Sequence, residues 1–74
     1  MTRYTQADVE MADRHIAEGE CHIARQEELV SRLGIQGHST REAEKLLALL
    51  NSTQVEHHVH RAAIVAALQP DGRS

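Results

Sequence analysis

Apolar residues recur every seven positions along the first half of the chain. The series consists of Val9, Ile16, Ile23 and Val30. A period of seven places these side chains on one stripe of a helix, which is the seam along which a coiled-coil partner packs. The pattern therefore predicts one long amphipathic helix over residues 5–33.

A second heptad series follows a glycine-containing stretch. It consists of Ala43, Leu50, His57 and Ile64. The pattern predicts a second helix at 40–68, a loop at 34–39 and disordered tails at 1–4 and 69–74. Because a short link cannot return the chain to make a parallel pair, the predicted fold is an all-α antiparallel two-helix hairpin.

Capping signals mark the predicted ends of the two helices. Thr5 with Asp8 three residues later is a weaker form of the capping box, and Ser39 with Glu42 has the full Ser-x-x-Glu form. Gly34 is expected to adopt the left-handed conformation that ends the first helix.

The seam positions also predict how the helices are aligned. If Val30 packs level with Ala43, the facing pairs have residue numbers with a constant total, as an antiparallel ladder requires. The predicted second seam positions are Ala12, Gly19, Gln26 and Leu33 on one helix, and Leu46, Thr53, His60 and Ala67 on the other. The residues expected to form the hairpin core or a dimer interface are Val9, Ile16, Ile23, Val30, Leu33, Ala43, Leu46, Leu47, Leu50, Ile64 and Leu68.

Small size and few aromatic residues predict self-association. The chain has 74 residues with one Tyr and neither Phe nor Trp, so its core depends on aliphatic side chains that each bury less area. Two amphipathic helices lying side by side leave part of each apolar stripe uncovered. Further apolar residues lie off the main seam, namely Leu29, Leu47, Leu49 and Leu68. We therefore expect a homodimer in the form of a four-helix bundle.

Charge and hydropathy narrow the classes of partner. The net charge is −3, and residues 5–33 contain seven acidic residues against three arginines. This balance disfavours nucleic acid, whose binding needs clustered Lys and Arg. No apolar run approaches the roughly 20 residues of a membrane span, and the first residues lack the apolar region of a signal peptide. The sequence predicts a cytoplasmic protein that binds neither nucleic acid nor membranes.

Two small residues of the first predicted helix, Gly19 and Cys21, are expected to lie in different surroundings. Gly19 in mid-helix costs up to about 1 kcal/mol relative to Ala, which indicates close approach of another backbone unless the cost is simply tolerated. Cys21 falls opposite the seam, beside acidic neighbours that do not stabilise a thiolate. A single Cys forms no internal disulfide and no finger-type zinc site. We expect an inert, exposed thiol.

Three histidines are candidate metal ligands. His57 and His60 are three apart on the second helix, and His15 should lie near the same level of the first. Imidazoles from facing helices bind zinc, nickel or copper. Oxygen ligands would come from Asp13, Glu18 or Glu20. The alternatives are that these histidines form a hydrogen-bonded polar layer or reach water, in which case the protein has no cofactor.

The sequence contains no catalytic motif. There is no Ser-x-x-Lys, no glycine-rich phosphate loop and no His-Glu-x-x-His, and the adjacent acids Glu27 and Glu28 point to different helix faces. A two-helix hairpin also lacks the walled pocket of an enzyme. We expect a protein-protein interaction or regulatory module with an unidentified protein partner. The alternative is a bundle that binds a transition metal, zinc or nickel, or a small ligand.

Four short segments carry a family resemblance. They are residues 19–26 (Gly-Glu-Cys-His-Ile-Ala-Arg-Gln), the turn at 37–40, Glu44–Leu47 and His57–Arg61. Together they resemble short uncharacterised helical-hairpin proteins of alphaproteobacteria, over about residues 13–68. The resemblance implies a small bacterial cytosolic protein and brings no catalytic residue with it.

Overall fold

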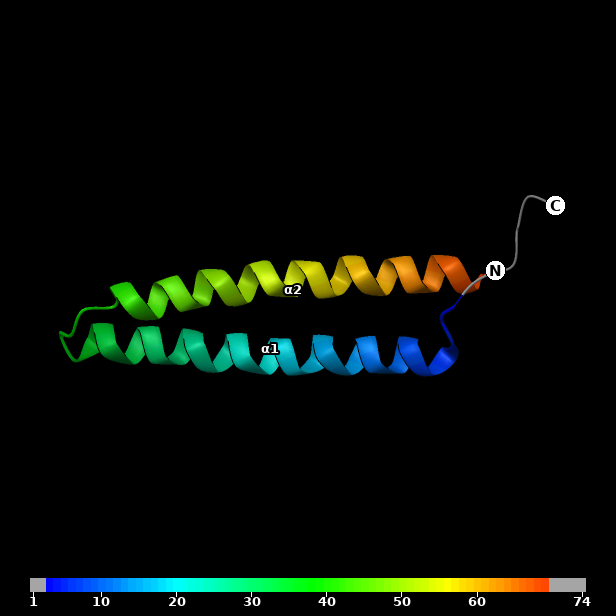
Figure 1. Ribbon diagram of the computed structural model, residues 1–74. Coiled ribbons are helices and arrows are strands. Elements are labelled where there is room, and N and C mark those ends of the chain that lie inside the picture. Colours follow the sequence, from blue (N-terminus) through cyan, green and yellow to red (C-terminus); the bar gives the residue numbers. More distant parts are fainter. Residues whose placement is uncertain (1–2, 70–74) are drawn as a thin grey trace.

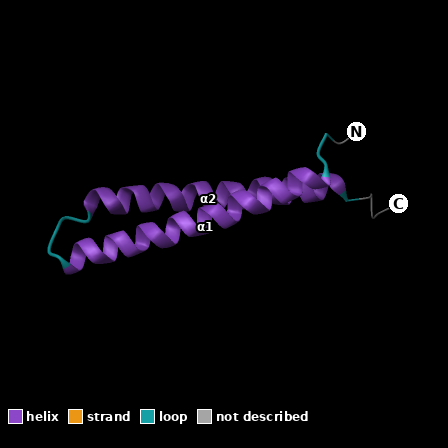
Figure 2. Cartoon of the chain, turned by 90° about the horizontal axis from the view of Figure 1, so that it is seen from below, coloured by secondary structure: helices purple, strands orange, loops and turns teal. Residues whose placement is uncertain are grey.

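The computed structural model describes residues 3–69 as two antiparallel helices packed along their length. Helix α1 spans Gln6–Ile35 and helix α2 spans Arg41–Leu68, joined by a short loop (Figure 1). Seen from below, the two helices cross at a small angle, as in coiled-coil packing (Figure 2). The predicted all-helical hairpin is confirmed, and the described part of the chain contains no strand. Residues 1–2 and 70–74, within the predicted tails, lie outside the described residues.

The first helix begins as its capping signal predicts. The Asp8 carboxylate accepts a hydrogen bond from the Thr5 backbone N–H at 2.7 Å and another from the Thr5 hydroxyl at 3.2 Å. A carboxylate in the first turn also opposes the positive end of the helix dipole. These contacts fix the start of α1 one residue after Thr5.

The loop differs from the prediction at its glycines. Gly34 stays helical, and Gly37 takes the left-handed conformation, with φ of 79°. The His38 N–H donates to the Leu33 carbonyl at 2.9 Å, and the Gly37 N–H donates to that of Gly34 at 3.1 Å. These two bonds define a Schellman motif, in which the left-handed residue is the one after the C-cap. The second of the two glycines therefore ends α1, since the helix continues through Ile35.

The second helix begins one residue later than predicted. Its N-cap is Thr40, whose hydroxyl donates to the Glu44 carboxylate at 2.7 Å. The predicted pair of Ser39 and Glu42 makes no mutual hydrogen bond in the structure; the Ser39 hydroxyl instead accepts from the Arg41 N–H at 3.3 Å. Ser39 and Thr40 each have a hydroxyl that suits a helix N-cap, and in the structure Thr40 is the N-cap residue.

Helix α1 turns both of its predicted seams toward α2. Apart from the capping residue Asp8, its buried or half-buried positions are Val9, Ala12, Ile16, Gly19, Ile23, Gln26, Val30 and Leu33. The heptad period alone therefore locates the packed face of this helix. At the end distant from the loop, Val9 and Ala12 form a small core with Ile64, flanked by Val65 and Leu68.

Helix α2 matches the prediction in one seam and differs in the other. Its first series, Ala43, Leu50, His57 and Ile64, is buried or half-buried. The second seam consists of Leu47, Gln54, Arg61 and Leu68, whereas the predicted Leu46, Thr53, His60 and Ala67 are exposed. An antiparallel helix presents its heptad in reverse order, so the second seam follows the first by four residues rather than three. The numbers of the residues that face each other in this corrected seam add up to the same total as in the first seam.

Truncation of Ile64 tests where the core lies. Ile64 is 2% exposed, so Ile64→Ala is expected to lower the free energy of unfolding by about 2–4 kcal/mol through lost burial and a cavity. Ile35 is 84% exposed, and Ile35→Ala should change it by less than about 0.5 kcal/mol. Chemical denaturation followed by circular dichroism measures both. Equal effects of the two substitutions would contradict this placement of the core.

Candidate functional site

The middle of the hairpin is held by a glutamine that enters the space above a glycine. Gln54 of α2 is 9% exposed, and its Nε2 donates to the Ile16 carbonyl of α1 at 2.8 Å. A Cβ atom on Gly19 would lie 1.9 Å from Gln54 Oε1. Gly19 therefore admits a side chain, not the second backbone that the sequence suggested. Gln54 Oε1 is buried and has no hydrogen-bond partner among the described residues.

A second glutamine makes the reciprocal contact nearer the loop. Gln26 of α1 is half-buried, and its Nε2 donates to the Ala43 carbonyl of α2 at 2.9 Å. Each helix thus sends one amide to the backbone of the other. Because both bonds reach fixed main-chain oxygens, a one-residue slip of either helix would break them. The two glutamines set the alignment that the apolar residues alone leave less defined.

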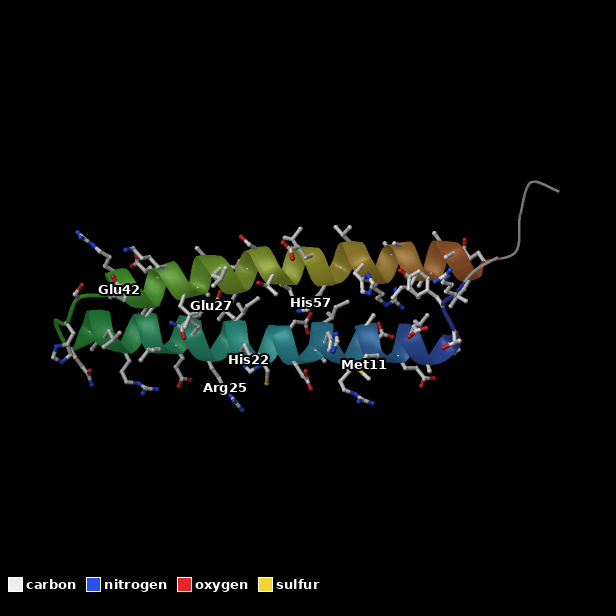
Figure 3. The ribbon with its side chains drawn as sticks, in the orientation of Figure 1. Met11, His22, Arg25, Glu27, Glu42 and His57 are labelled. Carbon is white, nitrogen blue, oxygen red and sulfur yellow. The ribbon has the colours of Figure 1, made fainter. Side chains whose placement is uncertain are left out.

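Next to Gln54, two histidines from opposite helices meet. The ring centroids of His15 and His57 are 5.6 Å apart, with the planes tilted by 44°. His57 is half-buried and His15 is exposed. Figure 3 shows His57 between the two helices, whereas Arg25 extends from the side of α1 that faces away from α2. The sequence placed these two histidines at one level, and the structure brings them together.

A shallow groove of about 260 Å³ surrounds this histidine pair. Its lining residues are His15, Glu18, Gly19, His22, Leu50, Thr53, Gln54 and His57. Gly19 and Gln54, which are in contact with each other, form part of its wall. It combines three imidazoles and one carboxylate with an apolar floor that includes Leu50.

The third predicted ligand, His60, does not join the pair. Its ring is exposed and packs edge-on against Tyr4, with centroids 6.1 Å apart. The cause is the corrected seam, which turns Arg61 inward and His60 to the flank. Arg61 pairs with Asp13 across the helices, so this predicted oxygen donor is engaged. Within residues 3–69, no three His, Cys, Asp or Glu side chains are already grouped to hold a metal ion.

The outward face of α2 is the other unusual surface. Val55 and Val59 are 62% and 64% exposed, and Leu49, nearer the loop, is 61% exposed. These valines belong to a further stripe of α2, with alternating spacings of four and three residues, on the side away from α1. We call it the outer stripe, and its residues, all exposed, are Ala48, Ser52, Val55, Val59, Ala62 and Ala66. Between Leu46 and His60 the sequence has one charged residue, Glu56. Helix α2 is thus apolar on two opposite faces, whereas α1 has a single apolar face.

Sequence reasoning missed the hydrogen bond of Gln54 to the other helix, the inward position of Arg61 and the outer stripe. The constant total of facing residue numbers pairs Gly19 with Gln54 and Ala12 with Arg61, so this rule contained the signal for both. Cys21 is exposed and unpaired, as expected from its position. No protein family, curated protein or solved structure matches the chain. Over residues 3–69, neither helix combines the length and apolarity needed to cross a membrane.

A double-mutant cycle tests the contact between Gln54 and Gly19. Gly19→Ala alone is expected to destabilise, because the new methyl group displaces the Gln54 amide and the bond to Ile16 is lost. In a Gln54→Ala background the same substitution should stabilise by up to about 1 kcal/mol, as Ala is the better helix former. Denaturant unfolding should give a coupling energy of at least about 1 kcal/mol. Additive effects would mean that the amide lies elsewhere in solution.

Proposed function

We propose that this protein is a self-associating helical interaction module. Two hairpins pair through the outer stripe of α2 and form a four-helix bundle. The observation that carries this proposal is the exposure of Val55 and Val59 on a heptad seam that has no partner in the hairpin. A heptad series of apolar residues on the solvent side of a helix is the pattern of a coiled-coil contact.

The order of side chains along the outer stripe favours a second copy as the occupant. From Ala48 to Ala66 the stripe is Ala-Ser-Val-Val-Ala-Ala, and in reverse it is Ala-Ala-Val-Val-Ser-Ala. Apart from one exchange of Ser and Ala, the two orders are identical. In a two-fold symmetric pair of antiparallel helices each residue of one half of the stripe faces one of the other half, so small residues face small residues and valine faces valine. Val55 of each copy would then face Val59 of the other at the centre.

Charge and side-chain size also favour pairing through α2. Small residues at the ends of the stripe permit close approach of two helices, and Glu56 is the one charged residue between Leu46 and His60. The outward face of α1 instead presents many charges, such as Glu10, Arg25 and Glu28. Burial of those charged side chains would cost free energy, whereas burial of the mostly apolar stripe would stabilise the dimer. The proposed bundle therefore places α2 inside and α1 outside, where α1 is free to contact a further protein.

A single charge on the stripe tests self-association. Val59→Lys places an ammonium group at the centre of the proposed interface and is expected to convert the dimer to monomer. Ala24→Lys on the exposed face of α1 is the matched control and should leave the dimer intact. Light scattering coupled to size exclusion at micromolar concentration measures the mass. A monomeric natural sequence, or equal behaviour of the two variants, would refute the proposal.

Disulfide trapping tests the antiparallel arrangement. In a Cys21→Ser background, Ser52→Cys chains mixed with Ala62→Cys chains are expected to cross-link to each other. Antiparallel pairing places these two positions side by side, within the reach of a disulfide. Two copies of Ser52→Cys would lie about 15 Å apart along the axis and should not cross-link. Efficient self-cross-linking of Ser52→Cys would instead indicate parallel helices.

A further inference from the structure

We propose that His15 and His57, with Glu18 as third ligand, bind a divalent transition-metal ion across the two helices. The ion would be of the class that imidazole prefers, such as Zn²⁺, Ni²⁺ or Cu²⁺. Water would complete the coordination in the open groove. This inference is independent of the proposed dimer, because the groove and the outer stripe share no residue.

The spacing of the two imidazoles carries the proposal. Two rings that share a tetrahedral ion, each with a metal–nitrogen distance of about 2.0 Å, have centroids about 5 Å apart. The centroids of His15 and His57 are 5.6 Å apart, and the two residues come from different helices. A shared ion would lie between the two rings once one ring nitrogen of each is turned toward it. The contacts of Gln54 and Gln26 fix the helix alignment that brings the two rings to this distance.

Glu18 is the ligand that completes the set. It lies three residues after His15, which places it on the same helix face about one turn away. Its side chain is exposed and lines the groove, so rotation about its side-chain bonds is unhindered by packing. Two imidazoles and one carboxylate on one side of an ion form a common metal-binding set that leaves coordination positions open. In the absence of an ion the carboxylate remains in water.

The surrounding charges are compatible with a cation. Arg61 lies one turn after His57 and would oppose a bound ion, but its guanidinium is paired with Asp13. The groove beside the two rings has a volume of about 260 Å³. His22, one turn beyond Glu18, lines the same groove and supplies another imidazole near the entrance. The site therefore has room, donors and a compensated positive charge.

A metal ion held by both helices would stabilise the hairpin. Any ligand that binds the folded chain and not the unfolded one raises stability according to its concentration and affinity. For tag-free protein with about 100 µM zinc chloride, we expect the melting temperature to rise by about 5 °C or more. The rise should persist in Val59→Lys, because the ligands belong to one chain.

Single substitutions decide which side chains bind. His15→Ala and His57→Ala should each abolish the zinc-induced shift, and Glu18→Gln should weaken zinc affinity about tenfold in calorimetric titration. His60→Ala is the matched control, because this imidazole is three residues from His57 but lies outside the groove. The shift in melting temperature should be unchanged in His60→Ala. Circular dichroism without metal establishes that each variant is folded.

Three results would overturn the proposal. One is an unchanged melting temperature of the natural sequence with zinc or nickel. Another is a shift that survives in both His15→Ala and His57→Ala, which would place the ion elsewhere. An unchanged zinc affinity in Glu18→Gln would overturn the assignment of this carboxylate as third ligand. Titration with Co²⁺ gives an independent readout, since visible absorption reports the ligand number directly.

Discussion

The contact between Gln54 and Gly19 is the constraint on which the middle of this hairpin depends. The glutamine side chain fills the space that any Cβ on Gly19 would take, and its amide bonds to the Ile16 carbonyl. Aliphatic layers tolerate a shift of alignment, because one apolar side chain can replace another in them. A buried amide aimed at one carbonyl tolerates none, because a misplaced amide loses its hydrogen bond. The meeting of His15 with His57 and the groove beside them follow from this fixed alignment.

The sequence predicts the helices well because a heptad period is a geometric property of one helix. Every seam position of α1 is turned inward, and the hairpin follows from the length of the loop. The second seam of α2 was misplaced because its period was applied in the direction of α1. Capping was predicted less well near the loop, where Gly34 and Gly37, like Ser39 and Thr40, offer equivalent chemistry. Backbone hydrogen bonds decide between such neighbours, and no sequence pattern encodes them separately.

The candidate sites were only partly accessible from the sequence. The pairing of His15 with His57 follows from the alignment of the helices. The separation of His60 from this pair instead depends on the second seam of α2, which lies one residue further along the chain than predicted. The hydrogen-bond partner of Gln54 was not predicted, although a buried polar side chain normally has one. Its partner is a main-chain carbonyl, which every residue possesses and which a sequence therefore does not mark. The outer stripe was not recognised, since its alanine and serine residues give little hydropathy signal.

The two helices differ in the number of apolar faces that they present for packing. Helix α1 has one apolar face, which packs against α2, and a charged outer face. Helix α2 has two apolar seams on opposite sides, of which the hairpin covers one. Such a helix is suited to the interior of a bundle, with partners on both sides. In the proposed dimer, pairing through α2 leaves the histidine groove on the flank and open to water. Self-association and ion binding would then occupy separate surfaces, and each could be removed by substitution without loss of the other.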